Sequence, residues 1–154
     1  MNAEDEILVD TICRELYERI GDDSIFSLPW VAQVVTVFLG ADKYIGNGGF
    51  IYFFEGDYPG NPPYSIFVDA YRAIGAHESA KCIEAAASLF PFADPHLHGD
   101  ARRDYLREHC MANGREISSS PFVKLGDRVM DNIDSDYSLL ARYIRDHLDE
   151  IRNT

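Results

Sequence analysis

Apolar residues recur every three or four positions through most of the chain, which is the pattern of amphipathic α-helices. One such stripe runs from position 4 to position 20 and is followed by Gly21, so we expect a first helix over 4–20 that ends at this glycine. Pro29 stands where the first turn of a helix tolerates proline, and the ten residues after it have little polar relief. The pattern therefore predicts a second helix, beginning at Pro29, at the centre of the core.

The second helix runs into the segment Gly46-Asn47-Gly48-Gly49. Three glycines in four positions favour turn and left-handed conformations, so we expect them to break the helix with a sharp reversal. The apolar run 50–54 that follows could be a buried strand, which its aromatic residues favour, or a short buried helix, which its helical surroundings favour. The segment has neither the G-x-G-x-x-G nor the P-loop pattern and follows a helix, which indicates a structural corner rather than a nucleotide-binding loop.

The rest of the chain continues in helical periods. The stripes predict helices that end at Gly75 and at Pro91, and then a polar helix over about 100–112. Ser120, which precedes a proline, should cap a further helix, and Ser135 should cap a last one. The count is seven or eight helices with no secure strand, which predicts an all-α fold.

Composition and charge restrict the class of protein. The 154 residues contain 46% hydrophobic residues, enough for one ordinary core, so we expect residues 1–154 to form a single compact multi-helix domain. Fourteen Lys and Arg against 26 Asp and Glu give a net charge of -12, which argues against direct binding to nucleic acid. Three cysteines without a C-x-x-C pair, an acidic N-terminus and no long apolar run predict a cytoplasmic protein without an export signal or a membrane span.

One loop has an enzyme-like composition. If the segment were extended, four alternating side chains would leave one side of the backbone and could approach a divalent metal ion: Asp94, His96, His98 and Asp100. The neighbouring proline and glycine, and the absence of an H-E-x-x-H spacing, favour an ordinary exposed loop instead. No serine elbow or activated cysteine is evident either, so we expect no catalysis, no metal and no cofactor.

Acidic residues form two stripes at helical spacing. In the first helix, four of them share a side away from the apolar stripe: Glu4, Glu15, Glu18 and Asp22. Near the C-terminus, Asp127, Asp131 and Asp134 do the same. Carboxylates spaced by about 5–6 Å between Cβ atoms resemble successive phosphates of a nucleic-acid strand, so a basic DNA-binding surface could accept them. An ordinary solvated helix face is the alternative interpretation.

The middle of the chain resembles a known family. Its most specific elements are Asn47-Gly48-Gly49-Phe50, the aromatic residues that follow, and Ile74-Gly75-Ala76 some 24 residues later. Over about residues 28–91 these resemble the DNA mimic protein 19 family, a bacterial group of small, acidic, all-helical proteins. Two positions depart from the family pattern: Tyr52 stands where glutamine is usual, and Glu55 where asparagine is frequent.

The resemblance implies a non-enzymatic protein, with a homodimer as its expected state. Such a protein presents carboxylates to a basic DNA-binding protein, such as a transcription regulator or a nucleoid protein, where DNA phosphates would otherwise lie. It also implies that Asn47, Gly48, Gly49, Phe50 and Gly75 are structural motif residues. Two other functions stay open at this point: an immunity or antitoxin-type inhibitor of one cognate toxin, and a metal-dependent enzyme at the histidine-containing loop.

Overall fold

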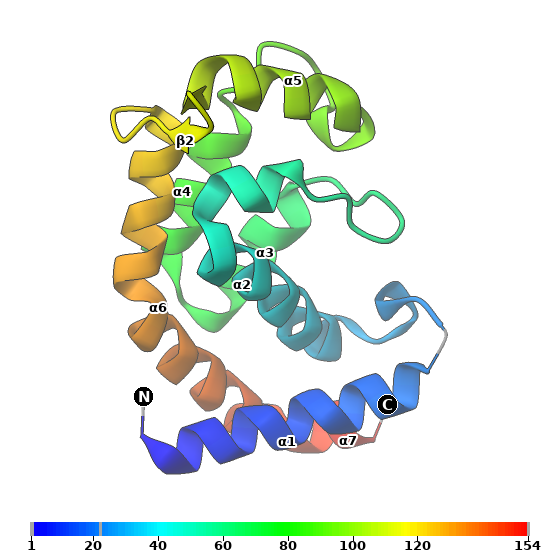
Figure 1. Cartoon of the computed structure of the whole chain (residues 1–154). Helices are drawn as coiled ribbons and strands as arrows, with labels where there is room; N and C mark the ends of the chain where they lie inside the picture. Colours follow the sequence, from blue (N-terminus) through cyan, green and yellow to red (C-terminus); the bar gives the residue numbers. More distant parts are fainter. Residues whose placement is uncertain (1, 22, 154) are drawn as a thin grey trace.

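The computed structural model describes residues 2–21 and 23–153. These residues form seven α-helices, two short 3-10 helices and one small hairpin (Figure 1). In chain order the elements are α1 (Ala3–Ile20), η1 (Ile25–Ser27), α2 (Trp30–Glu55), α3 (Ser65–Ile74), α4 (His77–Ala87), η2 (Pro95–Leu97), α5 (Gly99–Cys110), β1 (Met111–Ala112), β2 (Arg115–Glu116), α6 (Pro121–Asp146) and α7 (Leu148–Arg152). The expectation of a mostly helical, compact domain is confirmed. None of the described helices is both long enough and apolar enough to cross a bilayer.

The two longest helices, α2 and α6, are the framework on which the others pack. α2 packs against α3, α5 and α6, and α6 packs in addition against α4 and α1. In Figure 1, α6 runs along one side of the molecule, from the hairpin and α5 at one end to α1 and α7 at the other. α6 carries exposed residues at several positions between 121 and 135 and again between 142 and 146.

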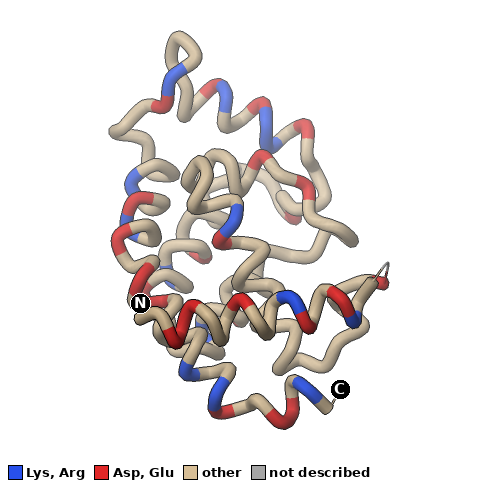
Figure 2. Tube along the Cα trace, turned by 60° about the horizontal axis from the view of Figure 1, so that its bottom comes forward, with Lys and Arg blue, Asp and Glu red and all other residues tan. Residues whose placement is uncertain are grey.

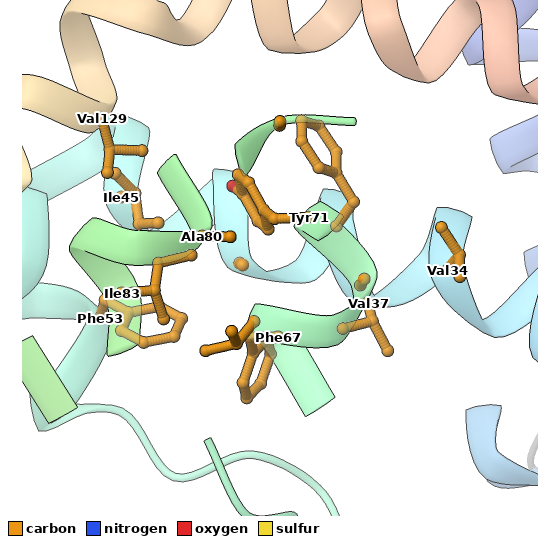
Figure 3. Close-up of a cluster of buried hydrophobic side chains, with 14 of the residues drawn as sticks. Val34, Val37, Ile45, Phe53, Phe67, Tyr71, Ala80, Ile83 and Val129 are labelled. Atoms are coloured by element: carbon orange, nitrogen blue, oxygen red, sulfur yellow. The ribbon is translucent and has the colours of Figure 1, made fainter. Parts of the chain in front are cut away.

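The first half of α2 lies at the centre of the core, as its apolar sequence predicts. The consecutive residues 34–38 are all buried, so this part of the helix has neighbours on every side. Figure 3 shows side chains of α2 meeting Phe67 and Tyr71 of α3 and Ile83 of α4. This is why the segment carries almost no polar residues and no clear amphipathic period.

The glycine segment is a kink inside α2. Gly48 (φ -168°, ψ 26°) and Gly49 (φ 60°, ψ -158°) leave helical geometry, and helical backbone resumes at Phe50. The positive φ of Gly49 is a conformation that a residue with a Cβ rarely adopts. The predicted break is thus present, and of the two alternatives for 50–54 the helix is correct and the strand is wrong. After the kink the backbone of Phe50 lies against α6: a Cβ added to Gly126 would be 2.9 Å from the Phe50 amide nitrogen.

α6 is one continuous helix where the sequence predicts two. Ser120 precedes Pro121 at its start, as expected, but Ser135 is inside the helix rather than at a new N-terminus. The Ser135 hydroxyl donates to the carbonyl oxygen of Asn132 at 2.7 Å, which satisfies it without interrupting the helix. The predicted cap at Ser135 is therefore wrong, and the last helix, α7, is short.

A buried aspartate, Asp136, and a half-buried one, Asp42, fix α6 to its neighbours. The Ser79 hydroxyl of α4 donates to Asp136 at 2.5 Å, and the Tyr137 hydroxyl donates to Asp42 of α2 at 2.7 Å. Burial raises the pKa of both carboxyls, and the charge of Asp42 raises that of Asp136 further, although the Ser79 hydrogen bond opposes the shift. The folded chain therefore binds a proton at these carboxyls more tightly than the unfolded chain does.

We expect the unfolding free energy of the Asp136→Asn variant to increase relative to that of the wild type as the pH rises. The raised pKa means that, above the ordinary aspartate pKa of about 3.9, the carboxyl loses its proton more readily in the unfolded chain than in the folded one. The unfolding free energy of the wild type therefore falls as the pH rises, whereas that of the Asp136→Asn variant, which has no proton to lose there, does not fall for this reason. An asparagine oxygen can still accept the Ser79 hydrogen bond. Urea unfolding of both proteins between about pH 4 and pH 8 measures the effect. A difference in unfolding free energy that stays constant with pH would contradict it.

Candidate functional site

Three aspartates lie along the outer side of α6. Asp127, Asp131 and Asp134 are all exposed, whereas Gly126 and Val129, which share the helix with them, are buried. Among the described residues, no Lys or Arg side chain is within ion-pairing distance of any of the three carboxylates. The helix thus presents three exposed carboxylates in a row, none of which forms an ion pair with a described residue.

Two of the cationic side chains of α6 pair with other carboxylates. Arg128 lies 3.8 Å from Glu78 of α4, and Arg145 pairs with Asp5 of α1. Arg145 is therefore directed away from the aspartate row, whereas Lys124 and Arg128 lie one helical turn from Asp127 and Asp131 without forming an ion pair with them. We call the set Asp127, Asp131 and Asp134 the α6 stripe.

The predicted acidic stripe of α1 is divided by the fold. Glu4 and Glu18 are exposed, and Asp22 lies outside the described residues. Glu15 is engaged by Arg152, whose Nε and one terminal nitrogen donate to its two carboxylate oxygens at 3.1 and 3.0 Å. These hydrogen bonds lower the pKa of Glu15. Glu15 therefore ties α1 to the C-terminal helix and offers less free charge than its spacing predicts.

The N-terminal end of α1 is fixed against α6. Asp5 is buried and pairs with Arg145, and its amide donates to the Asn2 side chain at 2.8 Å, which caps the helix. Figure 2 shows acidic positions at this end of α1 beside acidic positions of α6. The exposed Glu4 is therefore at the end of α1 that lies next to α6, while Glu18 is at the other end.

The structure adds two acids that the sequence pattern did not single out. Glu6 and Asp10 are exposed and one turn apart on α1. Asp10 is close enough to Tyr137 of α6 for its charge to help raise the pKa of that phenol, although burial and the bonded Asp42 carboxylate contribute more. Tyr137 lies one turn after Asp134. The i, i+4 spacing of Glu6 and Asp10 is visible in the sequence, but which flank of α1 faces α6 depends on the tertiary packing.

The family motif residues around the glycine segment 46–49, which we call the glycine corner, and Gly75 make structural contacts. The Asn47 amide donates to the carbonyl oxygen of Lys43 at 2.5 Å, one turn back in α2. Gly75 ends α3 in the left-handed conformation with φ 91°, and its amide donates to carbonyl oxygens of the last turn. Tyr52, which departs from the family pattern, is half exposed and lines a shallow hollow of about 570 Å³ together with Glu55.

The loop considered for a metal ion has a different geometry from the one that a site requires. Residues 95–97 form the 3-10 helix η2 and α5 begins at Gly99, so the four side chains do not alternate along an extended backbone. Asp100 pairs with Arg103 at 2.9 Å, and the His96 and His98 rings lie against Tyr64 and Phe92. Within the described part of the chain, no group of three or more His, Cys, Asp or Glu side chains is placed to hold a metal ion. The extended conformation that would place Asp94, His96, His98 and Asp100 on one side is therefore not the one that this segment adopts.

Comparison with family models gives a match over residues 27–147, to the model described as DMP19-like protein. This is well over half of the chain. The chain belongs to the DMP19-like protein family. No curated protein and no solved structure matches it.

The stretch matched by the DMP19-like family model includes the acidic residues of α6 but not those of α1. The glycine corner, Gly75 and all of the α6 stripe lie inside the matched stretch, whereas α1 precedes it. The α6 stripe is thus carried by the part of the chain that defines the family. The family resemblance seen in the sequence over 28–91 is confirmed and extends to the end of α6.

Proposed function

We propose that this DMP19-like protein is a non-enzymatic DNA mimic that occupies the DNA-binding surface of a basic DNA-binding protein. The observation that carries the proposal is the α6 stripe, three exposed carboxylates in a row with no described cation within ion-pairing distance. Residues one helical turn apart have Cβ atoms separated by about 5–6 Å, so the row can present negative charge at intervals comparable to those of a phosphate backbone. Family membership supports the same function through the DNA-mimic role that the family name implies.

The proposed partner is a transcription regulator or a nucleoid protein in the cytoplasm, and the proposed state of the chain is a homodimer. A chain with net charge -12 attracts a cationic surface over distances of about a Debye length, about 8–10 Å at physiological salt. Charge at the edge of an interface mainly speeds association and selects the partner, and it makes binding sensitive to salt. The exposed acids at the N-terminal end of α1, Glu4, Glu6 and Asp10, would extend the charged surface beyond α6.

We expect the triple substitution of Asp127, Asp131 and Asp134 by Asn to weaken binding roughly 3- to 100-fold. Each exposed ion pair contributes about 0.2–1 kcal/mol, and three of them together give that range. The measurement is affinity capture from bacterial lysate at low salt, followed by elution in salt steps. The variant should release basic DNA-binding proteins at a lower salt concentration than the wild type.

A matched control separates the stripe from net charge. Asp94→Asn, Glu108→Gln and Glu116→Gln remove the same three charges from exposed positions at the α5 end, where no described cation pairs with them. The control variant should retain the wild-type elution profile. If both triple variants lose binding equally, the net charge and not the α6 stripe determines it. Capture of a single protein that resists salt and does not bind DNA would favour the immunity or antitoxin-type function instead.

A further inference from the structure

An apolar pocket lies away from the acidic surface, between α1, η1, the first half of α2, the loop 56–64 and α3. Its volume is about 220 Å³. The walls are built largely from Ile25, Phe26, Val37, Tyr58, Ile66 and Phe67. In Figure 1, segment 23–29 and the loop after α2 lie on the same side of the molecule.

A glycine keeps this pocket open. Gly40 lies on its wall, in the middle of a helical segment, and a Cβ added there would meet no atom within 4 Å. Glycine in a helix interior lowers helix stability relative to alanine, so close packing usually explains its presence. Such packing does explain Gly126, whose Cβ would meet the Phe50 backbone, but nothing in the described structure fills the space beside Gly40. A larger side chain at position 40 would therefore have space to extend from the wall of the pocket.

The walls of the pocket are held in place by internal contacts. The Tyr58 hydroxyl donates to the carbonyl oxygen of Phe53 at 3.3 Å, and the Tyr58 ring packs on Phe67 with centroids 4.7 Å apart. The loop also lies against η1, because a Cβ on Gly60 would be 3.6 Å from the Phe26 ring. A ligand would enter a pocket that already has its shape, which lowers the cost of ordering on binding.

The charge at the pocket is opposite to that of the protein as a whole. Of the residues that the structure describes, Lys43 is the one charged residue that lines the pocket, and no described carboxylate does. Lys43 is exposed and has no carboxylate within ion-pairing distance among the residues that the structure describes. The hydroxyl of Thr36, another lining residue, already donates to backbone carbonyls of its own helix. An apolar cavity whose described lining carries one cation and no carboxylate matches a ligand with an apolar body and a single negative charge.

We propose that this pocket binds a small carboxylate with an aromatic or short aliphatic body, the carboxylate lying beside Lys43. A cavity of about 150 Å³ with apolar walls is sufficient for benzene, so 220 Å³ leaves room for a ring and a short chain. The volume is smaller than the range of about 300–1,000 Å³ typical of sites for drug-sized ligands, which argues against nucleotides and other large cofactors.

The test uses 3-phenylpropionate as the probe and its neutral amide as the matched comparison. Titration of ¹⁵N-labelled protein should give saturable shifts at amides around Gly40, Lys43 and Tyr58, with the amide analogue binding about 1.5- to 5-fold more weakly, as expected for loss of one exposed charged contact. Lys43→Met keeps the aliphatic stem and should bring the two probes to equal affinity. Gly40→Leu fills the pocket and should abolish binding of both probes.

Two outcomes would overturn the proposal. One is the absence of saturable shifts in the wild type up to about 10 mM of either probe, which corresponds to less binding energy than even a weak specific site provides. The other is binding that persists unchanged in Gly40→Leu, since that places the probe elsewhere. Circular dichroism of the Gly40→Leu and Lys43→Met proteins shows whether each remains folded. If Gly40→Leu does not fold, the comparison of the two probes with Lys43→Met still tests the proposal.

Discussion

Replacing Arg102 by methionine is expected to lower the unfolding free energy by about 3 kcal/mol or more. Arg102 is 1% exposed, the largest fully buried side chain of the described residues. Its guanidinium donates to the carbonyl oxygens of Phe54, Gly56 and Pro95 at 2.9, 3.2 and 2.5 Å, and to the Asp57 carboxylate at 2.6 Å. Methionine fills much of the volume but donates nothing, so the three carbonyls lose a partner that a buried acceptor requires.

Arg107→Met is the matched control for this prediction. Arg107 is on the same helix and also pairs with an aspartate, Asp104, at 3.0 Å, but both side chains are well exposed. Exposed pairs of this kind contribute at most about 1 kcal/mol. Chemical denaturation of the three proteins measures the difference. Comparable losses for Arg102→Met and Arg107→Met would contradict the structural role assigned to Arg102.

Gly126→Val is expected to lower the unfolding free energy by about 2–3 kcal/mol. The Cβ alone would lie 2.9 Å from the Phe50 amide nitrogen and 3.4 Å from two atoms of its side chain. The nearest atom belongs to the backbone directly after the kink of α2, which cannot rotate away as a side chain can. α6 would have to move outward, and the buried contacts between the two central helices would open.

The same substitution at Gly40 provides the comparison. Gly40 is also inside a helix, but its Cβ would meet nothing within 4 Å. Because valine forms helix slightly better than glycine, Gly40→Val should have a stability within about 0.5 kcal/mol of the wild type or above it. Thermal unfolding of both variants is sufficient to rank them. A Gly126→Val protein as stable as Gly40→Val would show that the close approach of α2 and α6 is not required.

The sequence was informative where local pattern decides the structure. The stripe over 4–20 and the terminating Gly21 predicted α1 to within a residue, and Gly75 was recognised as the end of α3. Ser135 shows the limit of this approach. A serine is a good helix cap by propensity, but the apolar stripe of α6 continues past it to Leu140 and Ile144, and burial of that stripe outweighs the local preference.

One missed element did carry a local signal. Asn113-Gly114 connects β1 to β2, and both residues have positive φ, 52° and 73°. This dipeptide is a strong indicator of a two-residue hairpin turn. The strands on either side have only two residues each and no apolar alternation, so the turn was not supported by any strand pattern.

The candidate surface was predictable in part. Helical spacing is enough to place Asp127, Asp131 and Asp134 on one exposed side, because the period of a helix is fixed. Whether an acid is compensated depends on residues far away in the chain, as Glu15 shows with Arg152, 137 positions later. The burial of Arg102 likewise depends on residues far away in the chain, because two of its hydrogen-bond acceptors come from α2 and η2.

The most direct test of the account is competition between DNA and this protein for one partner. A basic DNA-binding protein captured from lysate at low salt would be bound to a labelled duplex that carries its site, and the acidic protein would be titrated in. The account predicts that the duplex is displaced, and that the variant with Asn at 127, 131 and 134 needs a severalfold higher concentration to displace it. A ternary complex in which duplex and protein bind together would contradict DNA mimicry.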